Sequence, residues 1–431
     1  MAQYLDVRTL NCSKQLALGC LLACYVLVCL ASFLLSLDHS DHHLRFVPQA
    51  LPKAIGWAML FSVVSFVFMV ARFSFGYFIS FYFYTVIFGF VLLSWFTDFI
   101  YDHETARASA MVSFVAFMLP ATLLSVPISR PTLSLSGFEL LLNLLLVFCA
   151  ATAVLGACYN FRFVGLGSIY EFRSTLKYPL PVGYSIGIAS SSVLPFLFAT
   201  FVSQGRRWRI LLTLALLLAF YPITLTKMAF FSSIWLLWFA LLLRFVGARA
   251  TVILSLLVPL LIGVVLFAIF SEQARAYFEL VNFRMVTTPA SLLNVYNDFF
   301  ARHGPTGFCQ VSVLNKLLSC PDGPALPETL EKIYGIGYLN ASLFATEGIA
   351  SVGLLFAPAI AFLCGSVVSI GNSVSRGLPP RFVLLSGAVL SQYFLNVPLT
   401  TVLVTHGAAL LFLLWYLTPR EALCPGAESL Q

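Results

Sequence analysis

The side chains best suited to chemistry on a polar substrate lie in one long interval, from about Phe270 to Thr346. Its ionisable residues include Arg275, Arg284, Asp298, Arg302, His303, Lys316, Glu331 and Lys332. Guanidinium and ammonium groups neutralise anionic groups, and a histidine can accept a proton near neutral pH. If the chain acts on a polar substrate, this interval is the first candidate for the site.

A second polar group lies in a Gly-containing stretch between Tyr159 and Pro181. Its charged residues are Arg162, Glu171, Arg173 and Lys177. Three cations beside one carboxylate suit a phosphate or pyrophosphate head group. Alternatively, the cations extend to lipid head groups and pair with Glu171. For Arg173 and Lys177 both interpretations stay open, and for Arg162 the lipid interpretation is preferred.

Two further ionisable residues lie at or within apolar runs. Lys227 ends a short turn that begins at Tyr221, and a lysine in such a place is ordinarily an interface anchor. His406 lies within the last apolar run, where an ionisable residue usually faces the interior of a helix bundle. A neutral imidazole bonded to a neighbouring helix is the preferred interpretation. We expect no metal site, because the cluster Asp38, His39, Asp41, His42 and His43 lacks partners with the spacing of a closed zinc site.

The composition identifies the elements that must position these residues. Of the 431 residues, 60% are hydrophobic and only 10% are charged, whereas roughly a quarter are charged in soluble domains. The apolar runs are continuous, which favours helices over barrel strands in a membrane. We therefore predict an all-α, polytopic integral membrane protein.

About twelve apolar runs are long enough to cross a bilayer. They cover residues 15–37, 54–71, 74–97, 108–127, 138–160, 182–203, 209–226, 229–246, 250–270, 347–370, 382–396 and 398–418. The expected organisation is nine transmembrane helices in residues 1–270, a long extracytoplasmic loop or lid in residues 271–346, and three more helices with a cytoplasmic tail in residues 347–431. Basic residues are in excess in the even-numbered connectors and the tails, which places both termini in the cytoplasm. This asymmetry accounts for the net charge of +7 without a nucleic-acid partner.

Within the long loop, residues 271–283 and 289–302 form two predicted helices, each with an apolar face. We expect them to lie along the membrane surface and to cover the mouth of the bundle. The second ends at Gly304-Pro305 and so presents Arg302 and His303. Cys309 and Cys320 lie in the same outer loop, where disulfides are permitted. We predict that they are bonded, with two free thiols as the alternative.

Four places in the chain, taken together, resemble the O-antigen polymerase (Wzy-type) family. They are Ile169-Tyr170-Glu171-Phe172-Arg173, the turn from Thr224 to Lys227, the stretch from Arg284 through Tyr296, Asp298, Phe299 and Phe300 to His303, and Leu339-Asn340-Ala341 through Glu347-Gly348. The similarity covers roughly residues 159–370. An Arg followed eleven residues later by Gly, which is associated with the family, is absent from the third connector and from the long loop.

The resemblance implies a GT-C-like, metal-independent membrane glycosyltransferase without a cofactor. It would polymerise undecaprenyl-pyrophosphate-linked oligosaccharide repeat units at the periplasmic face of the bacterial inner membrane. Partners would be the lipid-linked substrates, the membrane, and a chain-length regulator and flippase of the same pathway. We expect Arg173, Lys227 and Arg284 to bind the pyrophosphate, and His303 or Glu171 to act as the base. Secondary candidates are Lys177, Arg302 and His406.

Two other functions remain open at this stage. A transporter or flippase of lipid-linked sugars would also use about twelve spans, but such carriers usually place polar residues at the bilayer midplane, whereas here they gather at the outer face. A ligase that joins finished polysaccharide to a lipid core would share architecture and substrate type.

Overall fold

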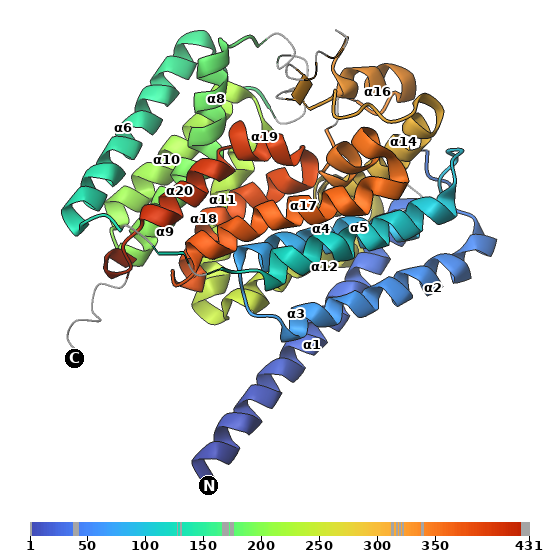
Figure 1. Cartoon of the computed structure of the whole chain (residues 1–431), viewed down its shortest axis with the longest axis horizontal. Coiled ribbons are helices and arrows are strands. Elements are labelled where there is room, and N and C mark those ends of the chain that lie inside the picture. Colours follow the sequence, from blue (N-terminus) through green and yellow to red (C-terminus); the bar gives the residue numbers. More distant parts are fainter. Residues whose placement is uncertain are drawn as a thin grey trace. The chain divides into compact units, whose positions relative to one another are not determined.

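The computed structural model describes residues 2–37, 43–126, 128–129, 132–165, 172, 176–311, 314–315, 318, 320, 323–337 and 340–423. The described residues are helical or irregular and contain no β-strand beyond an isolated bridge between Leu44 and Thr97. Side chains are described from Lys14 onward. Figure 1 labels the helices along the chain.

Among the described residues, ten helical segments are long and apolar enough to cross a membrane. They are Lys14–Leu37, Pro48–Val70, Phe75–Leu93, His103–Leu123, Leu135–Tyr159, Leu180–Gln204, Arg207–Thr224, Lys227–Phe245, Ala248–His303 and Phe344–Ser375. The chain is therefore an all-helical, membrane-embedded protein. The predicted runs 382–396 and 398–418 form shorter helices, α18 (Pro380–Asn396), α19 (Leu399–Val404) and α20 (Ala408–Leu417).

The chain divides into two compact units. Unit 1 comprises residues 1–124, 249–369 and 394–399, and unit 2 comprises residues 125–248, 370–393 and 400–431. The main helices of unit 1 are α1 (Ala2–Leu37), α2 (Leu51–Ser62), α3 (Phe66–Val70), α4 (Phe75–Leu93), α5 (His103–Leu123), α12 (Ala248–Phe270), α13 (Arg275–Phe278), α14 (Thr288–His303), α16 (Leu326–Tyr334) and α17 (Ser351–Ser375). Two π-helical stretches, η5 (Glu279–Thr287) and η6 (Phe344–Ala350), precede α14 and α17.

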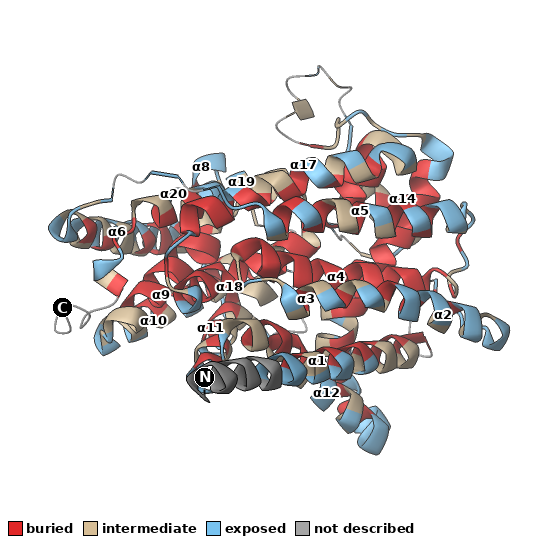
Figure 2. Ribbon diagram, turned by 60° about the horizontal axis from the view of Figure 1, so that its bottom comes forward, coloured by how far each residue is buried: buried red, intermediate tan, exposed pale blue. Residues whose placement is uncertain are grey.

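The centre of unit 1 is α4, in which every residue is buried (Figure 2). It has no charged residue, and its Ser74 cap accepts a hydrogen bond from Tyr77 N. Helices α2, α5 and α14 pack around it. Gly89 lets α14 approach closely, because a Cβ there would lie 2.7 Å from the Cβ of Ala290.

The expectation that residues 289–302 form a surface helix is wrong. In the structure α14 is buried from Thr288 to Phe300 and packs against α4 and η6. The chain reverses at residues 271–274, and Asn282 Nδ2 then donates to Leu260 O (2.9 Å) and Ser32 Oγ (2.8 Å). Within α14, Asn294 and Asp298 likewise accept hydrogen bonds from Tyr101 and Ile100 instead of facing water.

Unit 2 contains α6 (Leu135–Tyr159), α8 (Leu180–Ile188), α9 (Leu194–Gln204), α10 (Arg207–Thr224) and α11 (Lys227–Phe245), together with most of α18, α19 and α20. Helix α10 packs against α6, α9 and α11. Two of its membrane helices are irregular. A π-helix, Ala189–Val193, joins α8 to α9, and residues 405–407 separate α19 from α20.

Candidate functional site

The end of α14 in unit 1 is organised around Asp298, whose side chain is fully buried. Its Oδ1 accepts a hydrogen bond from Ile100 N (3.1 Å), and its Oδ2 accepts from Tyr334 Oη (2.6 Å) and from the Arg302 guanidinium. Burial raises the pKa of Tyr334, so its hydroxyl remains a donor. Because both carboxylate oxygens are engaged, Asp298 acts as a structural anchor that joins α14, α16 and the residues before α5.

Arg302 lies one turn after Asp298, the spacing that places two side chains on the same face of a helix. Its side chain is still 57% exposed although it pairs with the buried carboxylate. The ion pair therefore fixes the orientation of a guanidinium that solvent, or a ligand, can still reach. A guanidinium in this position can bind an anionic oxygen through its remaining N–H groups.

His303 is the last residue of α14 and is exposed. Its ring stacks on Phe299 with centroids 4.1 Å apart, and its Nδ1 lies 2.8 Å from the carbonyl oxygen of Phe299. A carbonyl can only accept, so Nδ1 carries the proton and the neutral ring has its lone pair on Nε2. Gly304, with φ 72°, ends the helix directly after it. The geometry thus presents Nε2 as a proton acceptor.

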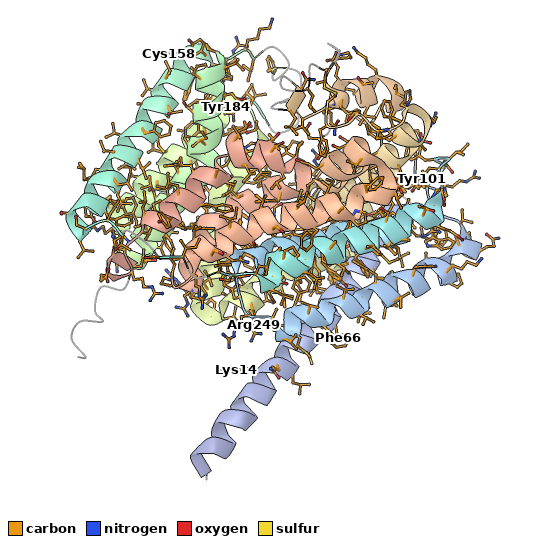
Figure 3. All side chains as sticks on the ribbon, in the orientation of Figure 1. Lys14, Phe66, Tyr101, Cys158, Tyr184 and Arg249 are labelled. Atoms are coloured by element: carbon orange, nitrogen blue, oxygen red, sulfur yellow. A yellow bond between two sulfur atoms is a disulfide. The ribbon has the colours of Figure 1, made fainter. Side chains whose placement is uncertain are left out.

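A second polar contact lies one turn earlier on the same face of α14. Tyr101, which precedes α5 (Figure 3), donates to Asn294 Oδ1 (2.6 Å), and burial raises the pKa of Tyr101. The buried Arg107 guanidinium lies 4.0 Å from the ring centroid of Trp95. Sequence reasoning missed Tyr101, Asn294, Arg107 and Tyr334. The one signal for them is the pair of polar residues 294 and 298, four apart on an otherwise apolar helix.

The remaining candidates of unit 1 lie on other segments. Arg284 is an exposed residue of η5. Cys309 and Cys320 form a disulfide, with Cα atoms 5.6 Å apart. Glu347 is buried in η6, where its carboxylate accepts from the Thr346 hydroxyl.

In unit 2, Lys227 is the half-buried first residue of α11. Helix α10 extends through Tyr221 to Thr224, so the connection is shorter than the turn expected from the sequence. Leu225 has φ 48°, and Thr226 caps α11 by accepting from Ala229 N. These local features determine where α11 begins and therefore the position of Lys227.

The connector between α6 and α8 is tied to the end of α10 at both of its described ends. Asn160 Nδ2 donates to Pro222 O (3.0 Å) and Ile223 O (2.8 Å), and the Tyr178 hydroxyl also donates to Ile223 O. Burial raises the pKa of Tyr178. Lys177, which precedes Tyr178, is exposed. The segment with Lys177 therefore contacts the last turn before Lys227.

His406 lies in the interruption between α19 and α20, within unit 2. Its Nδ1 is 3.2 Å from Ser191 Oγ, its ring stacks on Tyr393 at 3.8 Å, and its carbonyl accepts from Ser192 Oγ (2.5 Å). Both serines belong to the π-helix between α8 and α9. Two irregular stretches of helix thus meet at one imidazole.

Arg302 and His303, adjacent in the sequence, both lie at the exposed end of α14 in unit 1, and the segments that carry Lys177 and Lys227 are linked in unit 2. Glu171 and Arg173 lie outside the described residues. Arg284 belongs to unit 1 and Lys227 to unit 2, so a shared pyrophosphate site for Arg173, Lys227 and Arg284 stays a prediction. In the part of the chain that the structure describes, no three His, Cys, Asp or Glu side chains are grouped so as to hold a metal ion.

Comparison of the chain with protein-family models, curated proteins and solved structures finds no match. A proposal for its function therefore rests on the residues and contacts described above.

Proposed function

We propose that the protein is a membrane glycosyltransferase that polymerises lipid-linked oligosaccharide repeat units, carried on undecaprenyl pyrophosphate, at the outer face of a bacterial inner membrane. The observation that carries this proposal is the state of His303. Its Nδ1 lies 2.8 Å from Phe299 O, which leaves Nε2 of the exposed ring as the acceptor, and the preceding residue, Arg302, carries a guanidinium at the same end of α14. Transfer from an anionic leaving group requires a base for the attacking hydroxyl and positive charge at the leaving group, and the end of α14 carries a residue of each kind.

In the proposed step, a hydroxyl of the acceptor sugar donates its proton to Nε2 of His303, which becomes an imidazolium. The hydroxyl oxygen forms a bond to the anomeric carbon of the donor. The bond from that carbon to the pyrophosphate oxygen breaks, and the pyrophosphate leaves with the electron pair. Arg302 is a secondary candidate for binding the anionic leaving group. Arg173, Lys227 and Arg284 are the proposed ligands of the pyrophosphate, and Glu171 is the alternative base.

One observation favours a second candidate, a transporter or flippase of the lipid-linked unit. Helices α19 and α20 are separated at His406, and the π-helix with Ser191 lies against the interruption. Secondary transporters bind their substrates at interrupted helices of this kind. In that case His406, and not His303, would be the residue on which function depends.

The test compares His303→Ala with His43→Ala in a strain that lacks the gene. His43 is a matched control, because it is also an exposed histidine of unit 1 and contacts the carbonyl oxygen of Tyr334 (3.3 Å). Loss of a general base lowers the rate by about 10²- to 10⁴-fold. We therefore expect single repeat units on the surface for His303→Ala and long chains for His43→Ala, read from the length profile of the polysaccharide.

Normal chain lengths for His303→Ala, with the protein present in the membrane, would remove His303 from the reaction. Lipid-linked units that accumulate in the cytoplasm of the deletion strain would instead identify a flippase. Long polymer that is not attached to a lipid core would identify a ligase.

A further inference from the structure

A cavity of about 310 Å³ lies in unit 2 at the end of α20, away from the residues discussed so far. It is lined by Ile128, Thr132, Ser373, Arg376, Thr418, Arg420 and Glu421. Two guanidinium groups face one carboxylate in this lining, so its net charge is positive. Three hydroxyl residues complete the polar part of the wall, and of these Thr418 already donates to Leu414 O (2.6 Å). Such a lining suits an anion that accepts several hydrogen bonds.

The walls of the cavity come from three segments that are bonded to one another. These hydrogen bonds join Val126 N to Ser373 Oγ (3.0 Å), Arg376 Nη1 to Ser125 O (3.2 Å) and Leu133 N to Leu417 O (3.3 Å). The cavity is thus formed before any ligand binds, which lowers the entropic cost of binding.

The position of Arg420 depends on a glycine. Gly377 has φ 88°, and a Cβ at this residue would lie 1.4 Å from Nη2 of Arg420. The guanidinium therefore lies directly on the backbone of Gly377, next to Arg376 in the sequence. This contact holds two arginines from separate segments at one cavity, an arrangement that an anion between them would stabilise.

The surroundings add to the positive charge. Glu139, at the start of α6, is paired with Arg206 (2.6 Å) and Arg209 (3.2 Å). Gln204 links this group to the same terminal segment through Ala422 O (3.3 Å). Because two arginines pair with the single carboxylate of Glu139, this group carries a net positive charge, which attracts anions.

We propose that this cavity binds a phosphate group, either in the head group of an anionic phospholipid or in a soluble phosphate compound. The apolar helix α20 ends at Leu417 and the cavity begins at Thr418. The site therefore lies where an apolar helix gives way to polar chain, and a basic pocket at such a boundary can bind a lipid head group. This site is separate from the proposed transferase chemistry.

The test uses the purified full-length protein and two kinds of probe. Binding of phosphatidylglycerol is measured in nanodiscs of phosphatidylcholine, and binding of inorganic phosphate and pyrophosphate is measured in phosphatidylcholine alone. The variants are Arg376→Gln, Arg420→Gln and Gly377→Ala, and the control is Arg244→Gln, an exposed arginine of unit 2 outside the cavity. Gly377→Ala removes no charge; its Cβ would displace the guanidinium of Arg420, and the alanine would also be strained at φ 88°.

We expect each cavity variant to weaken binding by about tenfold, since each loses a charge-assisted contact, while Arg244→Gln binds as the wild type does. Sensitivity confined to phosphatidylglycerol identifies a lipid site, and sensitivity to phosphate or pyrophosphate identifies a soluble ligand. Binding of both probes that is unchanged in Arg376→Gln and Arg420→Gln would overturn the proposal. If Gly377→Ala does not fold, the two glutamine variants still decide the question.

Discussion

The candidate residues of the two units are held in place by different kinds of contact. In unit 1, Arg302 and the end of α14 depend on one buried carboxylate, Asp298, which accepts all three hydrogen bonds. In unit 2, the connector that carries Lys177 is joined to the end of α10, just before Lys227, by two neutral side chains, Asn160 and Tyr178, that donate to backbone carbonyls. The hydrogen bonds in unit 1 therefore depend on one residue, whereas those in unit 2 are shared between separate side chains.

This difference has an energetic consequence. Hydrogen bonds to charged groups contribute about 1.5–3 kcal/mol each, and neutral ones about 1 kcal/mol. One substitution, at Asp298, should therefore remove all three hydrogen bonds at the end of α14. At the end of α10, each substitution should remove only the hydrogen bonds of one side chain. Three substitutions test this contrast, in order of decreasing effect.

Asp298→Ala should give the largest loss. The carboxylate binds Ile100, Arg302 and Tyr334, so its removal separates three segments at once. Because the guanidinium that remains is 57% exposed, water can solvate it, and we expect a loss of about 2–3 kcal/mol rather than the larger cost of a stranded buried charge. The measurement is denaturation of the purified protein, with the exposed Asp98→Ala as the control. Equal stability of the two variants would contradict the idea of a concentrated anchor.

Asn160→Ala should have an intermediate effect of about 1–2 kcal/mol, since two neutral hydrogen bonds are lost. Ile223 O still accepts from Tyr178 in this variant, and Pro222 O still accepts from the backbone of Arg162. Asn143→Ala, an exposed position on the same helix, should change stability by less than about 0.5 kcal/mol. A loss at Asn160 as large as that at Asp298 would show that the turn also depends on a single residue.

Tyr178→Phe should have the smallest effect, about 1 kcal/mol for one hydrogen bond. Burial raises the pKa of Tyr178 above its ordinary value of 10.0, so the hydroxyl donates to Ile223 O throughout the neutral range. The raised pKa means that this contribution is complete below pH 10 and is lost as the pH rises through the folded value. The difference between wild type and Tyr178→Phe should shrink there, and Tyr184→Phe, at an exposed tyrosine (Figure 3), is the control for loss of a hydroxyl. A constant difference at all pH values would assign the effect to packing.

Hydropathy predicted about twelve membrane spans, and ten helical segments of the described chain are long and apolar enough to be such spans, because a continuous apolar run has one physical explanation in a long hydrophobic chain. It failed for α14. Periodicity shows that Asn294 and Asp298 share a face that is polar, but it does not show whether that face meets water or protein. The partners Tyr101 and Tyr334 are far away in the sequence or in another helix, so only the fold reveals them.

The part of the candidate site that is determined by neighbouring residues in the sequence was predictable. Gly304 and Pro305 mark the end of α14, and the structure ends the helix at His303, with Arg302 and His303 presented there. The interruption at His406 was not predictable, since Thr405 and Gly407 leave the apolar run intact. The residues that contact it, Ser191 and Ser192, lie more than two hundred residues earlier in the chain.

The enclosure of α14 also constrains how the protein is made. Its buried face carries Asn294, Asn297 and Asp298, and such a segment gains little by entering lipid alone. Helix α4 is synthesised earlier, but η6 and the hydroxyl of Tyr334 emerge from the ribosome only afterwards. We therefore expect residues 288–303 to stay at the insertion machinery or at the bilayer surface until the following segment has been synthesised and packs against them.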